Sequence, residues 1–153
     1  TMVERLKRVQ SAAHDTGHEL LVELIPKRGA GPVEHSAVPR LMAALYERGL
    51  QPDWWKLPSM PRASLWREAA DVIAQHDDAC RGILVLGLEA PEAELAESFE
   101  LCAGVEAVKG FAVGRSLWAG PAGAWLRGEL DDEKLVERVA QAFTRLKEAW
   151  RQR

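Results

Sequence analysis

The sequence of 153 residues predicts an α/β fold in which parallel strands alternate with helices. Short apolar runs alternate with longer segments of helical periodicity, and each strand-plus-helix unit occupies roughly 30 residues, the size of a β/α repeat. The runs lack the polar alternation of a half-exposed sheet, which is typical of strands covered on both faces. Together these patterns favour a parallel sheet with helices packed against it.

The elements follow one another in a regular order. The chain begins with a helix over residues 3–16, which has apolar residues at helical spacing and Gly17 as its C-terminal cap. Strands are expected at 20–25, 53–57, 82–87 and 108–114, and helices at about 36–48, at 61–76 and from Pro91 onward. A stretch rich in Pro, Gly and Trp (118–128) precedes a long amphipathic helix with an apolar stripe of Leu135, Val139, Phe143 and Leu146.

Four β/α units make half of a (β/α)₈ barrel, whose full length is about 250 residues. A free-standing doubly wound sheet of four strands fits the same periodicity. No linker or low-complexity segment divides the chain, so residues 1–153 are expected to form one segment, a piece of a larger protein if the barrel is the correct fold.

The composition excludes several classes of function. A net charge of −3 offers no basic surface for a phosphate backbone, so nucleic acid is not an expected partner. No apolar run reaches membrane-spanning length and no signal peptide opens the chain, so a cytoplasmic protein without a membrane partner is expected. Cys80 and Cys102 lack metal-ligand spacing and are expected to be reduced thiols; neither a metal nor a cofactor is predicted.

Lys56 lies inside an aromatic strand that prolines bound on both sides, Pro52 to Pro58. Lysine is rarely buried in such an element unless it is paired or functional, and a desolvated amine is a carbonyl nucleophile. The alternative is an edge-strand lysine whose amine reaches water. Near the carboxyl end of a barrel strand, Lys56 would project into the mouth of the barrel, where active sites of this fold lie.

Glu23 is the single charged residue in the preceding apolar strand. A buried carboxylate needs a partner, and Lys56 on the adjacent strand is the obvious candidate. An inert ion pair that holds two strands in register is one interpretation. The other is a Schiff-base lysine beside a proton-transferring glutamate, the pair that carbon–carbon cleavage next to a carbonyl requires.

Gly114, Arg115 and Ser116 end the last strand. Glycine admits a ligand close to the backbone, free amides at the start of a helix attract anions, and arginine binds phosphate in a bidentate manner. The segment from Ser116 to Trp125 is expected to supply the short extra helix that accompanies phosphate sites in barrels. The triplet therefore predicts a phosphate site.

The run from Lys109 to Trp118, with Pro121, Trp125 and Gly128 behind it, resembles the end of a known domain. This is the aldolase-like barrel domain at the C-terminus of many bacterial 5-dehydro-2-deoxygluconokinases, enzymes of myo-inositol catabolism. The strands from Leu20 to Pro26 and from Asp53 to Leu57 match the same domain in order and spacing. The resemblance covers the whole chain but only the second half of the domain, which implies the C-terminal half of a (β/α)₈ barrel.

That domain is similar in turn to tagatose-1,6-bisphosphate aldolase, a class I aldolase. The resemblance implies that Lys56 forms the Schiff base, that Glu23 relays protons, and that Arg115 binds phosphate with Gly114, Ser116 and Gly87. One position departs from the pattern. Leu88 follows Gly87 where the resemblance implies an arginine, and this puts the identity of the substrate in doubt.

Two functions follow from the resemblance. The first is a class I aldolase without metal or cofactor that cleaves 2-deoxy-5-keto-gluconate 6-phosphate. The alternative is a non-catalytic sugar-phosphate-binding or assembly domain fused to a carbohydrate kinase. The expected partners are a phosphorylated sugar and either the missing N-terminal half-barrel or a second copy of the chain, because half a barrel has two open edges and an uncovered inner face.

Overall fold

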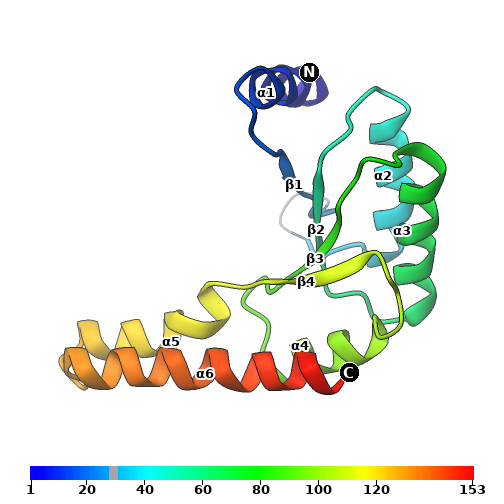
Figure 1. Cartoon of the computed structure of the whole chain (residues 1–153). Coiled ribbons are helices and arrows are strands. Elements are labelled where there is room, and N and C mark those ends of the chain that lie inside the picture. The colour runs from blue at the N-terminus through cyan, green and yellow to red at the C-terminus, as the bar shows by residue number, and fades with distance from the viewer. Residues whose placement is uncertain (28–30) are drawn as a thin grey trace.

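In a computed structural model that describes residues 1–27 and 31–153, the protein has four parallel strands in the order β1-β2-β3-β4 (Figure 1). The strands are β1 (Leu21–Glu23), β2 (Trp54–Pro58), β3 (Gly82–Leu86) and β4 (Val108–Ala112). The helices are α1 (Met2–Asp15), the short 3₁₀ helix η1 (His35–Ala37), α2 (Val38–Tyr46), α3 (Ala63–His76), α4 (Glu92–Leu101), α5 (Arg115–Leu126) and α6 (Asp132–Gln152). The predicted half-barrel of four parallel strands with outer helices is confirmed.

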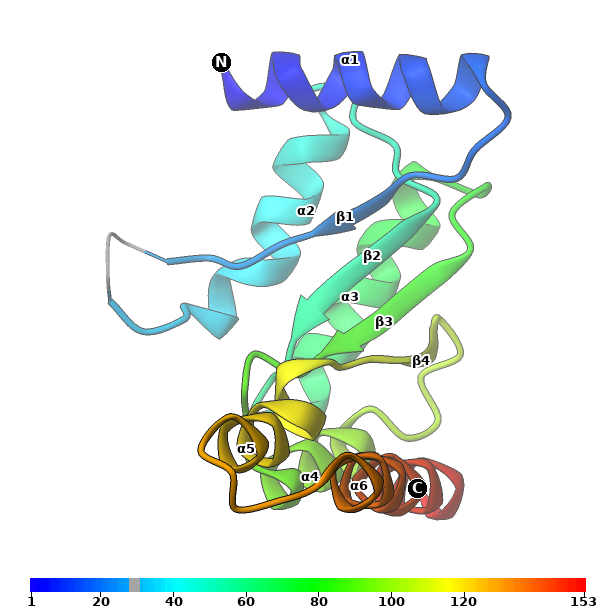
Figure 2. The same cartoon turned by 90° about the vertical axis from the view of Figure 1, so that its left-hand side faces the viewer.

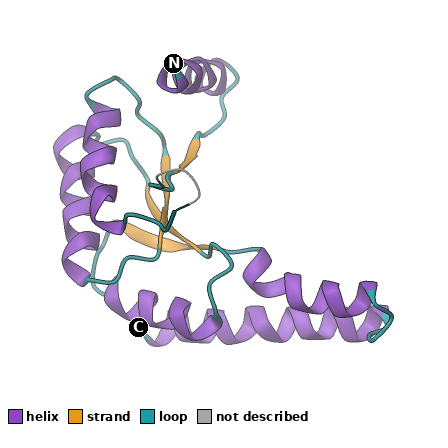
Figure 3. Ribbon diagram, turned by 180° about the vertical axis from the view of Figure 1, so that it is seen from behind, coloured by secondary structure: helices purple, strands orange, loops and turns teal. Residues whose placement is uncertain are grey.

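The helices cover only one face of the sheet. Helices α2 and α3 pack side by side on the outer face, and α4 lies next to α6 beyond β4 (Figures 1 and 3). Figure 2 looks onto the opposite, inner face, which no described helix covers. Helix α1 crosses the amino ends of the strands, where the Gln10 side chain accepts a hydrogen bond of 2.7 Å from the backbone N–H of Gln51. The carboxyl ends of the strands and the inner face therefore remain accessible.

The core lies between the sheet and its outer helices. In β2, Trp55 and Leu57 are fully buried on the helix side, whereas Trp54 and Lys56 occupy the inner face, as the two-residue period of a strand requires. The Trp55 indole N–H donates a 2.8 Å hydrogen bond to the Tyr46 hydroxyl at the end of α2. Burial raises the pKa of Tyr46 well above its ordinary value of 10.0, so the hydroxyl stays neutral.

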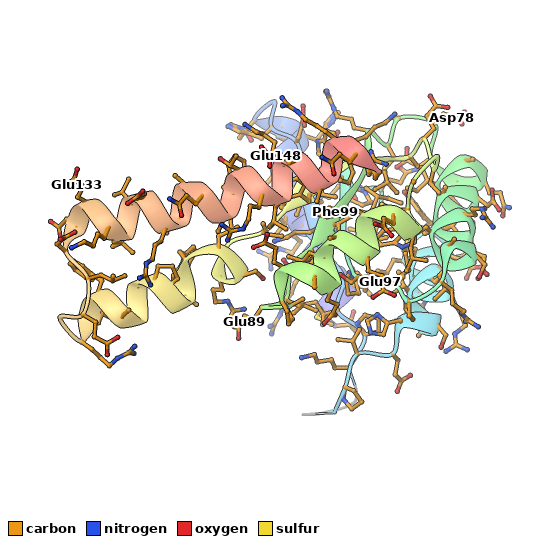
Figure 4. All side chains as sticks on the ribbon, turned by 90° about the horizontal axis from the view of Figure 1, so that it is seen from below. Asp78, Glu89, Glu97, Phe99, Glu133 and Glu148 are labelled. Atoms are coloured by element: carbon orange, nitrogen blue, oxygen red, sulfur yellow. The ribbon has the colours of Figure 1, made fainter. Side chains whose placement is uncertain are left out.

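Aromatic rings fix the last strand against the C-terminal helices. Phe99 of α4 stacks on Phe111 of β4 with ring centroids 5.1 Å apart, and it meets Trp150 of α6 edge-on at 5.2 Å. Figure 4 shows Phe99 between α4 and α6. Because these contacts hold the far end of α6, the first turns of α6 extend away from the sheet beside α5 (Figure 1).

A glycine and a bulge set the register of β4. Gly82 has a φ of +137°, and a Cβ there would lie 2.5 Å from the carbonyl oxygen of Ala107, so only glycine fits. The pairing of β3 with β4 then shifts from Ile83 opposite Val108 to Leu84 opposite Gly110, which leaves Lys109 as the extra residue. This shift places Gly110 in line with Lys56 on the inner face.

The first strand differs from its expected form. It spans three residues instead of six, because Pro26 has no N–H to donate to a sheet. The expectation that this strand is covered on both faces is wrong: Val22 is buried against the helices, but Leu21 is 42% exposed on the inner face. Within the described residues, no helix is both long and apolar enough to cross a membrane.

The hydrogen bond between Trp55 and Tyr46 gives a test of the core. Tyr46→Phe removes the acceptor and leaves a buried indole N–H unpaired, which should lower the free energy of unfolding by about 1–3 kcal/mol. The matched control is Glu19→Ala, which removes the acceptor of the more exposed Trp54 indole and should cost less than about 1 kcal/mol. Urea denaturation measures both. Equal losses in the two variants would contradict the placement of Trp55.

Candidate active site

Lys56 and Glu23 form an ion pair on the inner face of the sheet. The parallel register places the two residues directly opposite each other on β2 and β1, and the Lys56 Nζ lies 2.8 Å from the Glu23 Oε2. The side chain of Lys56 is 21% exposed and that of Glu23 is 39% exposed. The geometry brings together the two residues that sequence analysis assigned to chemistry; their catalytic role stays a prediction.

The alternation of β2 explains why Lys56 faces inward. Trp55 and Leu57 need the apolar helix layer, so the residue between them must point to the other side of the sheet. At the same level of the inner face, Leu84 of β3 and then Gly110 of β4 continue the row. The Lys56 amine therefore stands beside a carboxylate and a leucine, on the face that stays open to small molecules in this chain.

The pair contributes little to the stability of the sheet. Ion pairs that retain contact with water are typically worth 0 to about 1 kcal/mol, since hydration of the separate charges offsets most of the attraction. The register of β1 on β2 is fixed independently, because the Leu24 N–H donates to the Lys56 carbonyl at 3.0 Å and the Trp54 N–H to the Leu20 carbonyl at 3.1 Å. The pair is therefore not needed to set the register of the two strands.

A second group of predicted residues meets at the carboxyl ends of β3 and β4. Gly114 precedes α5, and no side chain caps the amino end of that helix. Gly87 approaches Ser116 so closely that a Cβ at position 87 would lie 2.9 Å from the Ser116 Oγ. This Oγ is buried and has no hydrogen-bond partner among the described residues. The first backbone amides of α5 and the Ser116 side-chain hydroxyl thus lie close together, and such an arrangement is suited to an anion.

Arg115, the predicted phosphate cation, already has a partner. Its guanidinium forms an ion pair with Glu89, and both side chains are more than half exposed. Glu89 lies in the turn after β3, where Leu88 and Glu89 have φ values of +46° and +63°. Non-glycine residues seldom adopt this left-handed conformation, which costs of order 1–3 kcal/mol and often occurs at functional sites. The turn directs the Glu89 carboxylate to the start of α5 (Figure 4).

Sequence analysis missed two charged residues near this site. Glu89 belongs to no recognisable sequence motif, and its ion pair with Arg115 depends on the backbone conformation of the turn after β3. Lys27, just after Pro26, lines a cleft of about 340 Å³ that also includes Gly87 and Leu88. A cation directly after a strand is the signal that sequence analysis could have used, because all four strands end at the same edge. The cleft therefore has one lysine in addition to the predicted residues.

No other cluster in the described chain suggests different chemistry. The described residues contain no group of three or more His, Cys, Asp or Glu side chains able to hold a metal ion. Burial raises the pKa of the Cys80 and Cys102 thiols above their ordinary value of 9.0, so both stay protonated at neutral pH and are poor nucleophiles.

The arrangement of strands and helices resembles part of the fold of a known aldolase. A solved structure of fructose-bisphosphate aldolase from Plasmodium falciparum, determined in complex with TRAP and a small-molecule inhibitor, matches it with a TM-score of 0.51 and 15% sequence identity. The match covers 82% of this chain and 42% of that aldolase, so the chain spans less than half the length of the protein it resembles. At this identity the likeness shows the fold alone.

Over residues 1–153 the chain matches the family described as "Uncharacterized protein conserved in bacteria (DUF2090)", and it belongs to that family. No curated protein matches the chain. The resemblance to an aldolase-type fold is thus supported by an independent solved structure, whereas the kinase fusion and the inositol pathway remain to be tested.

Proposed function

We propose that this protein is the lysine-bearing half of a class I aldolase that acts on a phosphorylated keto sugar acid. The observation that carries the proposal is the 2.8 Å contact between Lys56 and Glu23 at the carboxyl half of neighbouring parallel strands. A primary amine beside a carboxylate is the minimum that Schiff-base chemistry needs, and barrel enzymes carry their active sites at this end of the strands.

The pair supports the following reaction. Transfer of one Lys56 proton to Glu23 gives a free amine, which adds to the keto carbon. Glu23 returns this proton to the departing hydroxyl, so that water leaves, an iminium forms and Glu23 is again a carboxylate. Glu23 then accepts the proton of the hydroxyl two carbons away, and the intervening carbon–carbon bond breaks as its electron pair moves into the iminium. The resulting enamine takes a proton back from Glu23, and hydrolysis releases the second product and restores Lys56.

Phosphate recognition is assigned to Gly114, Arg115 and Ser116, with Gly87 allowing close approach. Gly87 lies three residues beyond Leu84, which pairs with Lys56, so the anion site is about 10 Å further along the strand direction. The long lysine side chain spans part of that separation. A phosphate at the start of α5 would compete with Glu89 for Arg115, and exchange of one anion for the other would free the Glu89 carboxylate.

The particular substrate that we propose is 2-deoxy-5-keto-gluconate 6-phosphate, cleaved to a three-carbon phosphate and malonate semialdehyde. The support is the resemblance of residues 109–118 to the aldolase-like domain of 5-dehydro-2-deoxygluconokinases. The presence of Lys27 in the cleft beside Gly87 adds a cation suited to the carboxylate of such a sugar acid. This assignment places the protein in myo-inositol catabolism in the cytoplasm.

Two observations favour the alternative, a sugar-phosphate-binding domain without turnover. Leu88 stands where the related aldolases are expected to carry arginine, and Arg115 is already paired with Glu89. A domain that has lost part of its phosphate site while it keeps Lys56 and Glu23 would bind ligand weakly and not turn it over. Covalent trapping separates the two functions.

We propose further that another polypeptide completes the barrel. The two edge strands, β1 and β4, lack a second neighbour among the described strands, and exposed apolar side chains lie on α5 and α6, among them Trp118, Leu126, Val136 and Phe143. Open edges and apolar patches of this kind promote association in water. The partner is the N-terminal half-barrel or a second copy of this chain.

Borohydride trapping tests the catalytic assignment. Reduction in the presence of the keto sugar phosphate should fix the substrate on Lys56, because borohydride reduces an iminium to a stable secondary amine, and peptide mass spectrometry locates the adduct. Lys56→Arg should give no adduct, since guanidinium cannot form the iminium. The matched control Lys109→Arg, at an exposed lysine of β4, should trap as well as the unmodified protein. An adduct that persists in Lys56→Arg would contradict the assignment.

Two variants with opposite effects test the phosphate site. Arg115→Ala should weaken binding of the phosphorylated sugar at least about tenfold, as expected for the loss of a charge-assisted hydrogen bond. Glu89→Gln should instead strengthen binding severalfold, because it removes the carboxylate that competes for Arg115. Calorimetric titration measures both. If both variants weaken binding equally, Arg115 and Glu89 act as a structural pair and the phosphate site is misassigned.

Sedimentation velocity tests the open inner face. The chain has a mass of 17.0 kDa, and we expect it to sediment as a dimer or larger species at micromolar concentration, or to associate with a co-expressed N-terminal half-barrel. A chain that remains strictly monomeric and does not associate with the half-barrel would contradict the proposal that another polypeptide covers this face.

A further inference from the structure

A second cavity lies away from Lys56, on the helix side of the sheet. It has a volume of about 220 Å³ and is enclosed by three segments: η1, the loop that follows β2, and α4. We call it the α4 cavity. Its polar lining consists of His35, Ser59, Ser98, Glu94 and Glu97, and Met60 and Leu101 contribute to its apolar wall. None of these residues takes part in the reaction proposed above.

Three buried polar atoms of this lining have no hydrogen-bond partner within the described part of the chain. They are the Nδ1 of His35 and the hydroxyl oxygens of Ser59 and Ser98. Ser98 is only 2% exposed, and it is the one polar residue among the buried residues that the structure describes. Buried polar atoms are nearly always paired in folded proteins, so three unpaired atoms around one cavity indicate that something other than this chain satisfies them.

The charges around the cavity select the class of ligand. The Glu94 and Glu97 side chains are both on exposed positions of α4, and Figure 4 labels Glu97 on the side of the helix turned toward η1 and α2. No lysine or arginine belongs to the lining that the structure describes, but Lys27 lines the adjoining cleft, which shares His35, Ser59 and Glu94 with the α4 cavity. Two carboxylates against this one lysine leave a negative balance, which disfavours phosphates and carboxylic acids and attracts a positively charged group.

We propose that the α4 cavity binds the ammonium group of a small alkylamine. An ammonium carries three N–H donors, and the cavity provides three unpartnered acceptors, Nδ1 of His35 and the two serine oxygens. Met60 and Leu101 supply the apolar contact for the alkyl chain, and the two glutamates supply the compensating charge. The proposal does not depend on Lys56 or Glu23, although the α4 cavity shares His35, Ser59 and Glu94 with the cleft that carries Lys27.

The same features distinguish the amine from other occupants. A neutral polyol would satisfy the hydroxyls but would gain nothing from Glu94 and Glu97. A quaternary ammonium would gain the charge but has no N–H to donate. Water alone would satisfy the polar atoms and leave the apolar wall unused. Each of these candidate ligands therefore corresponds to a different order of binding affinity among butylammonium, butanol and tetramethylammonium.

The experiment is a titration of the ¹⁵N-labelled chain with butylammonium, followed by heteronuclear NMR. Butylammonium should produce saturable shifts of the amides at 59–60 and 94–101, whereas butanol and tetramethylammonium should bind at least about fivefold more weakly. Glu94→Gln combined with Glu97→Gln should weaken binding by at least about fivefold. The matched control is Glu100→Gln, another exposed glutamate of α4 that lies outside the cavity lining, and it should leave the affinity within about twofold.

Ser98→Ala provides an independent variant that should fold. It removes an unpartnered hydroxyl from a buried position, so stability should hold or rise while butylammonium affinity falls at least about threefold. No saturable shift up to about 50 mM butylammonium would overturn the proposal and leave water as the occupant. Equal weakening by Glu100→Gln would overturn it as well, because binding would then follow surface charge. Tighter binding of butanol would assign the cavity to a neutral ligand.

Discussion

The alternation of side chains along β2 is the constraint on which the rest of the structure depends. Trp55 and Leu57 are fully buried beneath the outer helices, and the Tyr46 hydroxyl holds the Trp55 ring through a 2.8 Å hydrogen bond. With those two residues committed to the helix layer, Lys56 must occupy the inner face, because neighbouring residues of a strand point to opposite sides. The parallel register then brings Glu23 to within 2.8 Å of its amine. A buried tryptophan on one side of the strand thus determines that Lys56 lies on the other.

The helices cover only one face of the sheet, and this has a second consequence. The residues that stabilise the fold lie on the covered face, and the candidate site residues lie elsewhere. The apolar core joins α2, α3, α4 and the far end of α6 to the outer face of the sheet, and this burial supplies most of the folding free energy. The inner face and the carboxyl ends of the strands carry the ion pairs, the left-handed turn at Leu88 and Glu89, and the unpartnered Ser116 hydroxyl. Some of the features that cost free energy therefore lie where a ligand or a partner would compensate them.

Much of this arrangement could be predicted from the sequence, for reasons that are local. Continuous apolar runs and glycine or proline boundaries identified the four strands. The single charge in the first strand identified Glu23, and a lysine inside an aromatic strand bounded by prolines identified Lys56. Residues further apart escaped prediction. The ion pair of Arg115 with Glu89 depends on two left-handed φ angles, which no sequence motif predicts. The α4 cavity depends on how η1 and α4 are placed in the folded chain. The shortness of β1 was foreseeable from Pro26, whose missing N–H ends the ladder.

The central claim is that Lys56 and the Gly114–Ser116 segment serve one substrate. A crystal structure of the protein with the keto sugar phosphate, after reduction with borohydride, tests this claim most directly. The account predicts continuous electron density from the Lys56 Nζ to the former keto carbon, with the phosphate at the first turn of α5 and Glu89 displaced from Arg115. A sugar bound without a covalent bond to Lys56, or a phosphate that lies elsewhere while Glu89 keeps its ion pair, would contradict the account.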